Sequence, residues 1–312
     1  MQISITGATG FIGRRLVRHY EGRGAKIQLL SRKKVPVAGK GIKLFQHDLI
    51  TCDSSDLIDF VDGSDIVYHC AAEILDVCRM RKVNVEGTKK LLSAASGRVG
   101  RWVQLSSAGV YGQNLNGNIS EDISLSPDNA YERSKAAADM LVCEAAEKQK
   151  LQCVLLRPSI VYGIGMPNQS LFQLIRMIDR NMFFFIGKRG SVVNYIHVDN
   201  VVDALILCGT STLPINGRTY IVSDHRNLED FIGIIAAVLG KKMPQKRLPE
   251  SLLRAVVAVA GNIPRFPLSL SRVDALTNRA VYLTDRIESE LGYKNKISIE
   301  EGIGELARYC KK

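Results

Sequence analysis

The 312-residue sequence lacks the cysteine and histidine spacings that hold disulfide frameworks or metal ions. Its seven cysteines include no C-x-x-C pair, and their number is odd. This usage favours reduced thiols in a cytoplasmic protein over a disulfide-bonded one. The five histidines are dispersed, and no two of them lie four residues apart beside a carboxylate. We therefore expect no catalytic metal.

Long apolar runs are also absent. The longest, residues 255–263, is interrupted by Gly261 and Asn262 and is far shorter than the roughly 18 apolar residues of a membrane span. The opening Met1-Gln2-Ile3-Ser4-Ile5 has neither the charged nor the apolar region of a secretory signal. We expect a protein without a transmembrane segment.

Proline is scarce, with 9 residues, and 46% hydrophobic and 23% charged residues are ordinary globular usage, which excludes a disordered or collagen-like chain. Positive charge is in excess: 42 Lys and Arg against 31 Asp and Glu give +11. Such a field attracts anions. The basic residues are scattered pairs without interleaved aromatics, so we expect a small-molecule partner and no nucleic acid.

The first half of the chain alternates short apolar segments with longer amphipathic ones, the pattern of βαβ units around a parallel sheet. We predict an α/β fold with a doubly wound parallel (Rossmann) sheet. The expected strands are 2–6, 26–31, 42–46, 66–71, 101–106 and 152–157, and the expected helices are 11–22, 54–61, 83–96 and 130–149.

The pattern loosens after Pro158, although 170–181 and 199–208 still predict helices. Four of the nine prolines then fall within residues 244–267, which indicates irregular chain in a second, smaller lobe. We place a dinucleotide-binding domain at 1–166, with segments of about 190–225 returning to it, and a mainly substrate-binding lobe at 167–312.

A glycine-rich turn follows the first predicted strand and begins the first helix. Gly7 permits the tight turn, Gly10 lets the backbone approach a pyrophosphate, and Gly13 lets the helix pack closely on the strand. The helix N-terminus offers free N–H groups to the phosphates. A glycine turn that binds no ligand would have the same sequence motif. We nevertheless predict a dinucleotide site, which also includes Thr9, Phe11 and Ile12.

The second strand ends in Ser31-Arg32, where an acidic residue would select NAD. A guanidinium and a hydroxyl suit a 2′-phosphate instead, so we expect NADP, with NAD as the alternative. A basic loop facing water is the competing interpretation. Further residues at strand ends or on a helix are expected near the cofactor; they are Asp48, Leu49, Ala71, Ala72 and Asn84.

Tyr131 and Lys135 lie one turn apart on one face of the predicted helix 130–149. A phenol has a pKa near 10, and a nearby ammonium lowers that pKa by favouring phenolate. Ser107 ends the fifth strand, at the carboxyl edge where open α/β sheets bind ligands. These three residues therefore suit proton transfer to or from a substrate oxygen.

Together these residues resemble the extended branch of the short-chain dehydrogenase/reductase family, which includes nucleotide-sugar epimerases, dehydratases and keto-sugar reductases. The resemblance covers most of the chain. Its motifs are Thr6 to Gly13, Asp48-Leu49, Ala71-Ala72, Asn84, Ser107 four residues before Tyr111, Tyr131 with Lys135, Arg157-Pro158, Val161-Tyr162-Gly163 and Ile196-His197-Val198-Asp199.

The resemblance implies that Ser107, Tyr131 and Lys135 are catalytic. It also implies that Tyr131, Lys135 and Pro158 contact the cofactor and that the protein forms a homodimer. It implies a nucleotide-activated sugar as substrate, reduced at a 4-keto group or epimerised, with Tyr111 beside it. Many such relatives have an arginine where this chain has Asn194. Another arginine would then supply the positive charge for the phosphates of the sugar nucleotide; the candidates are Arg218, Arg265 and Arg272.

Two other functions stay open. Asn194, the phenylalanine triplet 183–185 and the apolar stretch 252–263 favour a hydrophobic alcohol or ketone, as in the hydroxysteroid and dihydroflavonol relatives. For the triplet by itself, packing in the core is the preferred interpretation. A regulator that binds NADP without catalysis is the other possibility, against which the intact trio of hydroxyl, phenol and amine argues.

Overall fold

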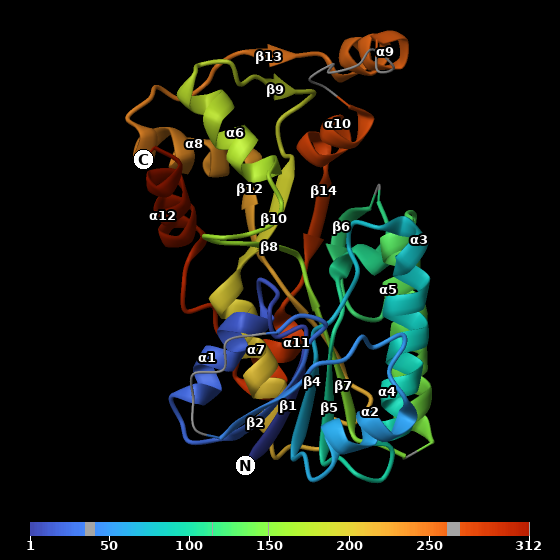
Figure 1. Cartoon of the computed structure of the whole chain (residues 1–312). Helices are drawn as coiled ribbons and strands as arrows, with labels where there is room; N and C mark the ends of the chain where they lie inside the picture. Colours follow the sequence, from blue (N-terminus) through green and yellow to red (C-terminus); the bar gives the residue numbers. More distant parts are fainter. Residues whose placement is uncertain (35–40, 114, 149, 261–268, 312) are drawn as a thin grey trace.

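The computed structural model describes residues 1–34, 41–113, 115–148, 150–260 and 269–311. A large domain with a central sheet contains the N-terminus, and a smaller lobe built mainly from the second half of the chain stands above it (Figure 1). No helix among the described residues combines the length and the apolar composition needed to cross a bilayer.

Seven parallel strands form the central sheet in the order β11-β7-β5-β4-β1-β2-β3. The chain adds strands outward from β1 first toward β3 and then, from β4 onward, on the other side of β1. This reversal between β1 and β4 creates the switch point where such sheets bind ligands. The strands are β1 (Gln2–Thr6), β2 (Lys26–Leu30), β3 (Ile42–Phe45), β4 (Ile66–His69), β5 (Arg101–Leu105), β7 (Cys153–Pro158) and β11 (Thr219–Val222). The predicted doubly wound α/β fold is confirmed.

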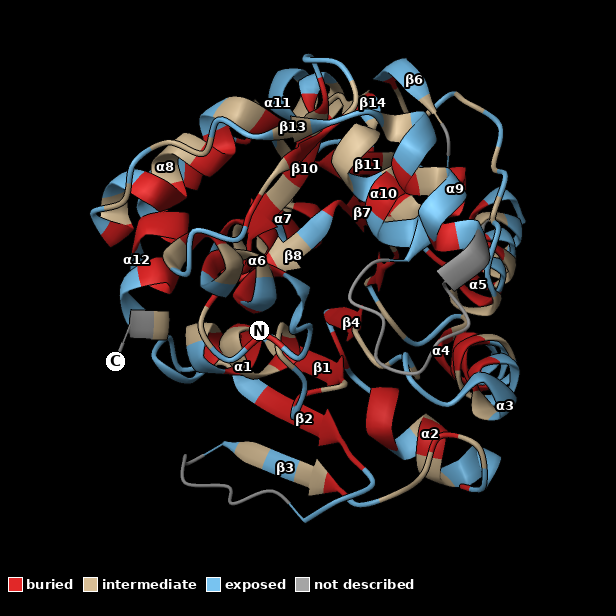
Figure 2. Ribbon diagram, turned by 90° about the horizontal axis from the view of Figure 1, so that it is seen from above, coloured by how far each residue is buried: buried red, intermediate tan, exposed pale blue. Residues whose placement is uncertain are grey.

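Helices cover both faces of this sheet. On one face lie α1 (Gly13–Glu21) and α7 (Val198–Thr210), and on the other lie α2 (Ser54–Val61), α4 (Thr88–Ala95) and α5 (Ala130–Glu147) (Figure 1). Leu16, Val17 and Tyr20 form the buried stripe of α1. Figure 2 shows the strands mostly as buried and the outer helix faces as exposed, because both sheet faces are covered.

Two features of the large domain differ from the sequence prediction. The strand β11 was not predicted, because it follows Pro158, where the strand and helix alternation that indicated the other strands is lost. The helix expected over 83–96 instead begins at α3 (Val77–Met80) and passes through a π-helical segment, η1 (Arg81–Gly87), before α4. The wider turn of η1 contains the buried Asn84, and π-helical turns are frequent at functional sites.

The smaller lobe has three short sheets. One contains β8 (Ile160–Tyr162), β10 (Val192–His197) and β12 (Asp224–Asn227); the others pair β9 (Phe185–Ile186) with β13 (Arg247–Leu248) and β6 (Asn116–Ile119) with β14 (Arg279–Tyr282). Its helices are α6 (Ser170–Asp179), α8 (Leu228–Leu239), α9 (Glu250–Ala260), α10 (Leu270–Thr277) and α12 (Ile299–Lys311). Two further elements are η2 (Ala108–Tyr111), which follows β5, and α11 (Asp285–Leu291), which packs against β11 of the central sheet (Figure 1).

An apolar cluster of its own stabilises this lobe. Helices α6, α8 and α12 pack on one another, with buried residues such as Ile175, Phe231 and Leu306 between them. Phe183 and Phe185 belong to the same cluster. Because they are core residues, they do not form the apolar substrate wall that the phenylalanine triplet suggested.

Candidate functional site

The glycine-rich turn brings β1, β4 and the start of α1 into close contact. Gly7 has a φ of +68°, and a Cβ there would lie 2.7 Å from the backbone of Cys70 and Ala71. A Cβ on Gly13 would lie 2.2 Å from the Gly7 carbonyl oxygen. Only glycine fits these two positions, and the turn leaves the first amides of α1 open to an anionic ligand.

A pocket of about 190 Å³ lies at this switch point. Nine of the predicted cofactor residues line it: Gly7, Thr9, Gly10, Ser31, Arg32, Asp48, Leu49, Ala71 and Ala72. The pocket also includes Thr6, from the predicted glycine-rich motif, and Leu30, His47, Cys70, Glu73 and Val83. Backbone and small side chains at the β1 and β4 ends leave room for a flat dinucleotide, so the residues present fit that group.

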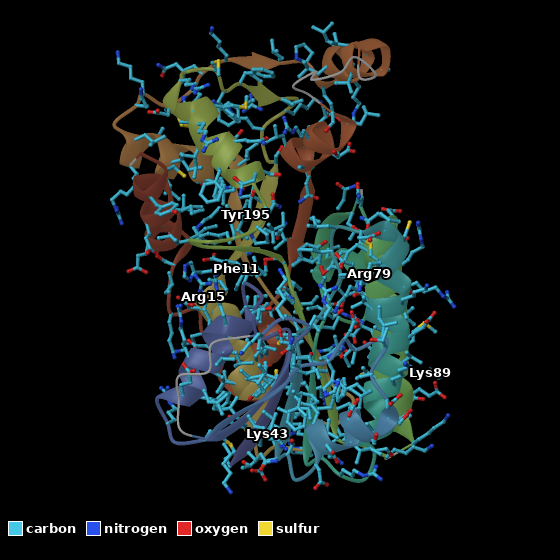
Figure 3. All side chains as sticks on the ribbon, in the orientation of Figure 1. Phe11, Arg15, Lys43, Arg79, Lys89 and Tyr195 are labelled. Carbon is cyan, nitrogen blue, oxygen red and sulfur yellow. The ribbon has the colours of Figure 1, made fainter. Side chains whose placement is uncertain are left out.

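Several predicted cofactor residues do not line this pocket. Phe11 packs against the apolar cluster of the smaller lobe, with the Arg15 guanidinium 4.7 Å from its ring centroid. Figure 3 shows Phe11 and Arg15 on the side of the large domain that faces Tyr195. Ile12 packs against the core of the large domain, and Pro158 pairs with Val222 in the sheet.

The adenosine end of the pocket has opposite charges close together. Arg32 is exposed at the end of β2, and its positive charge acts on Glu73. Backbone N–H groups, that of Leu75 foremost, and then Arg32 lower the pKa of Glu73. Asp48 accepts hydrogen bonds from the Ile50 amide at 2.9 Å and from Arg79 at 3.3 Å, which hold its carboxylate in place.

A buried hydrogen-bond chain ties the switch point to η1. The Ala71 amide donates to Thr6, whose hydroxyl lies 2.7 Å from His69 Nδ1. His69 Nε2 lies 2.9 Å from the Thr88 hydroxyl, which donates to the Asn84 carbonyl oxygen. Burial, and then the charge of Lys135, lowers the pKa of His69 to about 3. A neutral ring with its proton on Nε2 therefore satisfies every donor and acceptor in the chain.

Asn84 was predicted either to order the cofactor loops or only to cap a helix. Its side chain accepts from the Glu73 amide at 2.7 Å and donates to the Glu73 carbonyl and to the Ser134 hydroxyl, at 3.0 and 2.9 Å. The amide thus connects the loop after β4 with the first turn of α5.

Ser107, Tyr131 and Lys135 are brought together at the carboxyl edge of the sheet. Helix α5 begins with a capping box in which the Asn129 side chain accepts the Glu132 amide at 2.9 Å, and this places Tyr131 in the first turn. The Tyr131 phenol lies next to the Ser107 hydroxyl, which acts to lower the pKa of the phenol. Lys135 is buried one turn further along and donates to the Leu105 carbonyl oxygen at 2.5 Å.

The ionisation of Tyr131 differs from the sequence expectation. Burial, and then the negative charge of Asp139, raises the pKa of Tyr131 to about 12, whereas a lowered pKa was expected from Lys135. The Lys135 amine is directed to the Leu105 carbonyl, and its own pKa is lowered by burial. In the protein alone, the phenol therefore keeps its proton at neutral pH.

A cleft of about 580 Å³ adjoins Ser107 and lies between the large domain and the smaller lobe. Ser159 and Ile160 line it from the chain after β7, Asn194 and Tyr195 from β10, and further side chains come from η2, α9, α10 and β14. The Ser159 hydroxyl is buried there and has no hydrogen-bond partner among the described residues. The cleft is the candidate substrate site.

The three predicted substrate residues differ in position. Asn194 lines the cleft, but its amide joins β10 to β14 by donating to the Ala280 carbonyl at 2.8 Å and accepting the Tyr282 amide at 3.2 Å. Tyr111 is fully buried and its hydroxyl accepts from Arg157 at 2.8 Å, away from the cleft lining. Arg272 donates to Gln173 and is not among the lining residues.

The cations of the cleft are not the ones that the sequence suggested. Arg254 and Arg279 line it, whereas Arg218 pairs with Glu290 and Arg265 lies outside the described residues. Arg254 binds Glu250 and Asp274 on α9 and α10, each at 2.8 Å. Sequence reasoning missed these residues because no local motif marks a cleft wall formed by tertiary packing.

Comparison with known proteins decides the family. The profile described as the NAD dependent epimerase/dehydratase family matches residues 3–222, which include the pocket and all three residues of the catalytic candidate. The chain belongs to this family. Membership makes it an NAD-dependent oxidoreductase or epimerase.

This epimerase/dehydratase family member has full-length relatives with varied printed names. It is 29% identical to short-chain dehydrogenase/reductase family 42E member 1 of Macaca fascicularis, over 94% of this chain and 83% of that protein. It is 26% identical to a 4-hydroxy-2-methyl-3-oxo-4-farnesyl-3,4-dihydroquinoline-1-oxide ketoreductase of Stigmatella aurantiaca (98% and 96%) and 24% identical to a 3-beta-hydroxysteroid dehydrogenase of Mycolicibacterium neoaurum (99% and 91%).

Solved structures share the fold of this family member. The UDP-glucuronic acid 4-epimerase from Bacillus cereus, in complex with NAD, matches with a TM-score of 0.77 at 19% identity, covering 100% of this chain and 99% of that chain. The family match ends with β11, so α9, α10 and β14, which form much of the cleft wall, lie beyond it. The substrate-binding part is therefore the least determined by family membership.

Proposed function

We propose that this enzyme transfers hydride between NADP(H) and the carbonyl or carbinol carbon of an uncharged ketone or secondary alcohol. The single observation that carries the proposal is the position of the Tyr131 phenol next to the Ser107 hydroxyl, which lines the cleft, with Lys135 one helical turn away. When bound, the nicotinamide supplies the hydride.

The preference for the phosphorylated cofactor rests on the end of β2. Ser31 and Arg32 line the pocket where the adenosine ribose of a dinucleotide would lie, and no carboxylate follows them directly in the sequence. A guanidinium recognises a phosphate by charge-assisted hydrogen bonds. Glu73, held by three backbone amides, is a fixed carboxylate close enough for the charge of Arg32 to contribute to lowering its pKa.

The chain's own residues would assist the reaction as follows. Ser107 donates a hydrogen bond to the substrate oxygen, and Tyr131 donates its proton to that oxygen during reduction. The raised pKa of Tyr131 keeps the phenol protonated at neutral pH, which suits this general-acid role. Lys135, charged and buried below the phenol, stabilises the phenolate that proton transfer leaves behind.

Charge in the cleft favours an uncharged substrate. Three carboxylates, those of Glu132, Glu250 and Asp274, face two guanidinium groups, those of Arg254 and Arg279. Because Arg254 is already bound to two of these carboxylates, little free positive charge remains for a diphosphate. The full-length relatives whose names specify a hydroxysteroid and a farnesylated quinoline oxide support the same substrate class.

A nucleotide-activated sugar is the second candidate. Arg279 lines the cleft with one side of its guanidinium on the Arg189 carbonyl oxygen, which leaves other N–H groups for a phosphate oxygen. The fold neighbour that binds NAD is a UDP-glucuronic acid epimerase. This candidate includes reduction of a 4-keto sugar and epimerisation through a transient ketone.

One experiment tests the proposal and separates the candidates. The purified protein is incubated with NADPH and either a panel of apolar ketones, including a 3-ketosteroid, or UDP-sugars, and nicotinamide oxidation is compared with product formed. We expect stoichiometric oxidation of NADPH with an apolar ketone. Turnover of a UDP-sugar without net NADPH oxidation would establish epimerisation instead.

The variant Tyr131→Phe tests the mechanism, with Tyr309→Phe on the exposed face of α12 as the matched control. General acid catalysis contributes about 10²–10⁴-fold, so kcat of Tyr131→Phe falls by that factor while the Kd for NADPH stays unchanged. Unchanged turnover would contradict the mechanism. Binding of NADPH without any turnover by the wild type would favour the regulator.

A further inference from the structure

Asp139 is a buried carboxylate that the proposed reaction does not use directly. It lies on α5, four residues after Lys135 and eight after Tyr131, so all three lie on one face of the helix. The residue is 1% exposed. Burying a charge of this kind is costly unless partners compensate it, so its contacts indicate what it does.

One oxygen of Asp139 binds groups from two neighbouring strands. Its Oδ2 accepts the Ser106 hydroxyl at 2.8 Å and the Arg157 Nε and Nη2 groups, both at 3.0 Å. Ser106 precedes Ser107 at the end of β5, and Arg157 precedes Pro158 at the end of β7. Arg157 continues to the Tyr111 hydroxyl in η2, directly after Ser107.

The other oxygen of Asp139, Oδ1, is buried without a hydrogen-bond partner among the described residues. The contacts to Ser106 and Arg157 therefore engage only one of the two carboxylate oxygens. Lys135 is buried too, and Asp139 favours its charged form. Burial raises the pKa of Asp139, and the charges of Arg157 and then of Lys135 oppose that rise.

We propose that Asp139 is a positioning residue of the active site, which keeps Lys135 an ammonium group and holds the ends of β5 and β7 against α5. The inference rests on the proposed function, because Tyr131 and Lys135 act on a substrate only there. Asp139 itself touches neither substrate nor cofactor in this proposal; it acts through Lys135 and through the strand ends.

The other groups around this carboxylate and Lys135 do not replace it. Burial raises the pKa of Cys70 to about 12 and lowers the pKa of His69 to about 3, so both are neutral near Lys135 at neutral pH. The titratable and charged groups that face Asp139 or Lys135 are Tyr131 and Cys143 on α5, His69 and Cys70 at the end of β4, Tyr111 in η2 and Arg157 on β7.

The sign of the effect follows from the charges. Burial lowers the pKa of Lys135, and the Asp139 charge opposes that lowering. In Asp139→Asn the opposing charge is lost, so Lys135 loses its proton at a lower pH than in the wild type. An opposite charge at short range shifts such a group by about one to three pH units, so a shift of at least about one unit is expected.

The experiment follows Lys135 directly in the full-length protein labelled with ¹³C-lysine, with the resonance assigned from Lys135→Arg. We expect the wild-type Lys135 to be protonated at neutral pH, and its titration to move down by about one unit or more in Asp139→Asn. Asp139→Glu, which keeps the charge, should retain most of the wild-type titration. A neutral wild-type Lys135, or identical titrations in wild type and Asp139→Asn, would overturn the inference.

The pH profile of kcat for carbonyl reduction gives the second readout. Its alkaline limb should move to lower pH in Asp139→Asn, with kcat at high pH falling at least about tenfold. If Asp139→Asn does not fold, Ser106→Ala removes one hydrogen bond to the carboxylate and should move the titration in the same direction by less; no shift would then contradict the inference. Because the resonance needs no turnover, failure of the proposed function remains distinguishable from failure here.

Discussion

The Ser107 hydroxyl and the Tyr131 phenol lie next to each other although they belong to different elements, one at the end of β5 and the other in the first turn of α5. Ser107 also accepts the Gly109 amide at 3.1 Å, which orients its side chain. Because Ser107 lines the cleft, the pair is oriented for a substrate oxygen before any substrate binds.

Ser107→Ala is expected to lower kcat by about 10²-fold, since it removes one preorganised donor to the substrate oxygen. The KM for NADPH should change little, because Ser107 does not line the cofactor pocket. Steady-state kinetics measure both constants. Ser93→Ala, on the exposed face of α4, is the control; equal kcat values in the two variants would exclude a role for Ser107.

Arg32→Ala is expected to raise the KM for NADPH about tenfold to a hundredfold and to leave the KM for NADH nearly unchanged. The reason is the loss of a hydrogen bond to a charged phosphate, worth about 1.5–3 kcal/mol. Lys43→Ala is the matched control, because it removes the same charge from a residue of β3 that does not line the pocket (Figure 3). If Arg32→Ala keeps the wild-type preference for NADPH over NADH, as Lys43→Ala should, the assignment of NADP is wrong.

Gly13→Ala is expected to weaken cofactor binding strongly and to lower the free energy of unfolding by about 1–3 kcal/mol, because its Cβ would overlap the Gly7 carbonyl oxygen. Urea unfolding and NADPH titration measure the two effects. Gly22→Ala serves as the control, since a Cβ there meets nothing within 4 Å. Similar stabilities for the two variants would contradict the close approach of the turn and α1.

His69 should make the protein acid-sensitive. Its pKa is about 3 when folded and 6.5 in a free chain, so the unfolded state binds more protons between these values. The contribution of His69 to the free energy of unfolding is complete above about pH 6.5 and falls by up to about 1.4 kcal/mol per pH unit as the pH drops toward 3.

Urea unfolding over that pH range tests this prediction by comparing wild type with His69→Gln. The variant should show a shallower loss of stability, whereas His225→Gln, on an exposed residue of β12, should follow the wild type. Parallel curves for wild type and His69→Gln would mean that His69 is not the buried neutral group described above.

Much of the large domain was predictable from local patterns. Apolar runs at strand spacing matched six strands of the central sheet within about two residues, and the amphipathic segments matched α1, α2 and α5. Such periodicity depends on which face of an element is buried, and neighbouring residues already encode it. The strand β11 was missed because it lies beyond Pro158, outside the regular alternation of strands and helices that indicated the other six.

The candidate site was predictable in part, for a similar reason. Gly7, Gly10 and Gly13 are required by backbone geometry within one turn, and Tyr131 with Lys135 by one helical turn. The protonation of Tyr131 was not predictable, because it depends on burial and on Asp139.

Only the tertiary structure decided which side chains form the cleft and which are already engaged. Tyr111 is bound to Arg157, Asn194 joins β10 to β14, and Arg254 is neutralised by Glu250 and Asp274. By itself, the sequence determined the dinucleotide turn, the parallel sheet and the spacing of Tyr131 and Lys135, since these follow from local turn geometry, from the alternation of apolar strands with amphipathic helices, and from the helical repeat. Substrate choice depends instead on charges and hydrogen bonds between residues far apart in sequence, which meet only when the two parts of the molecule pack together.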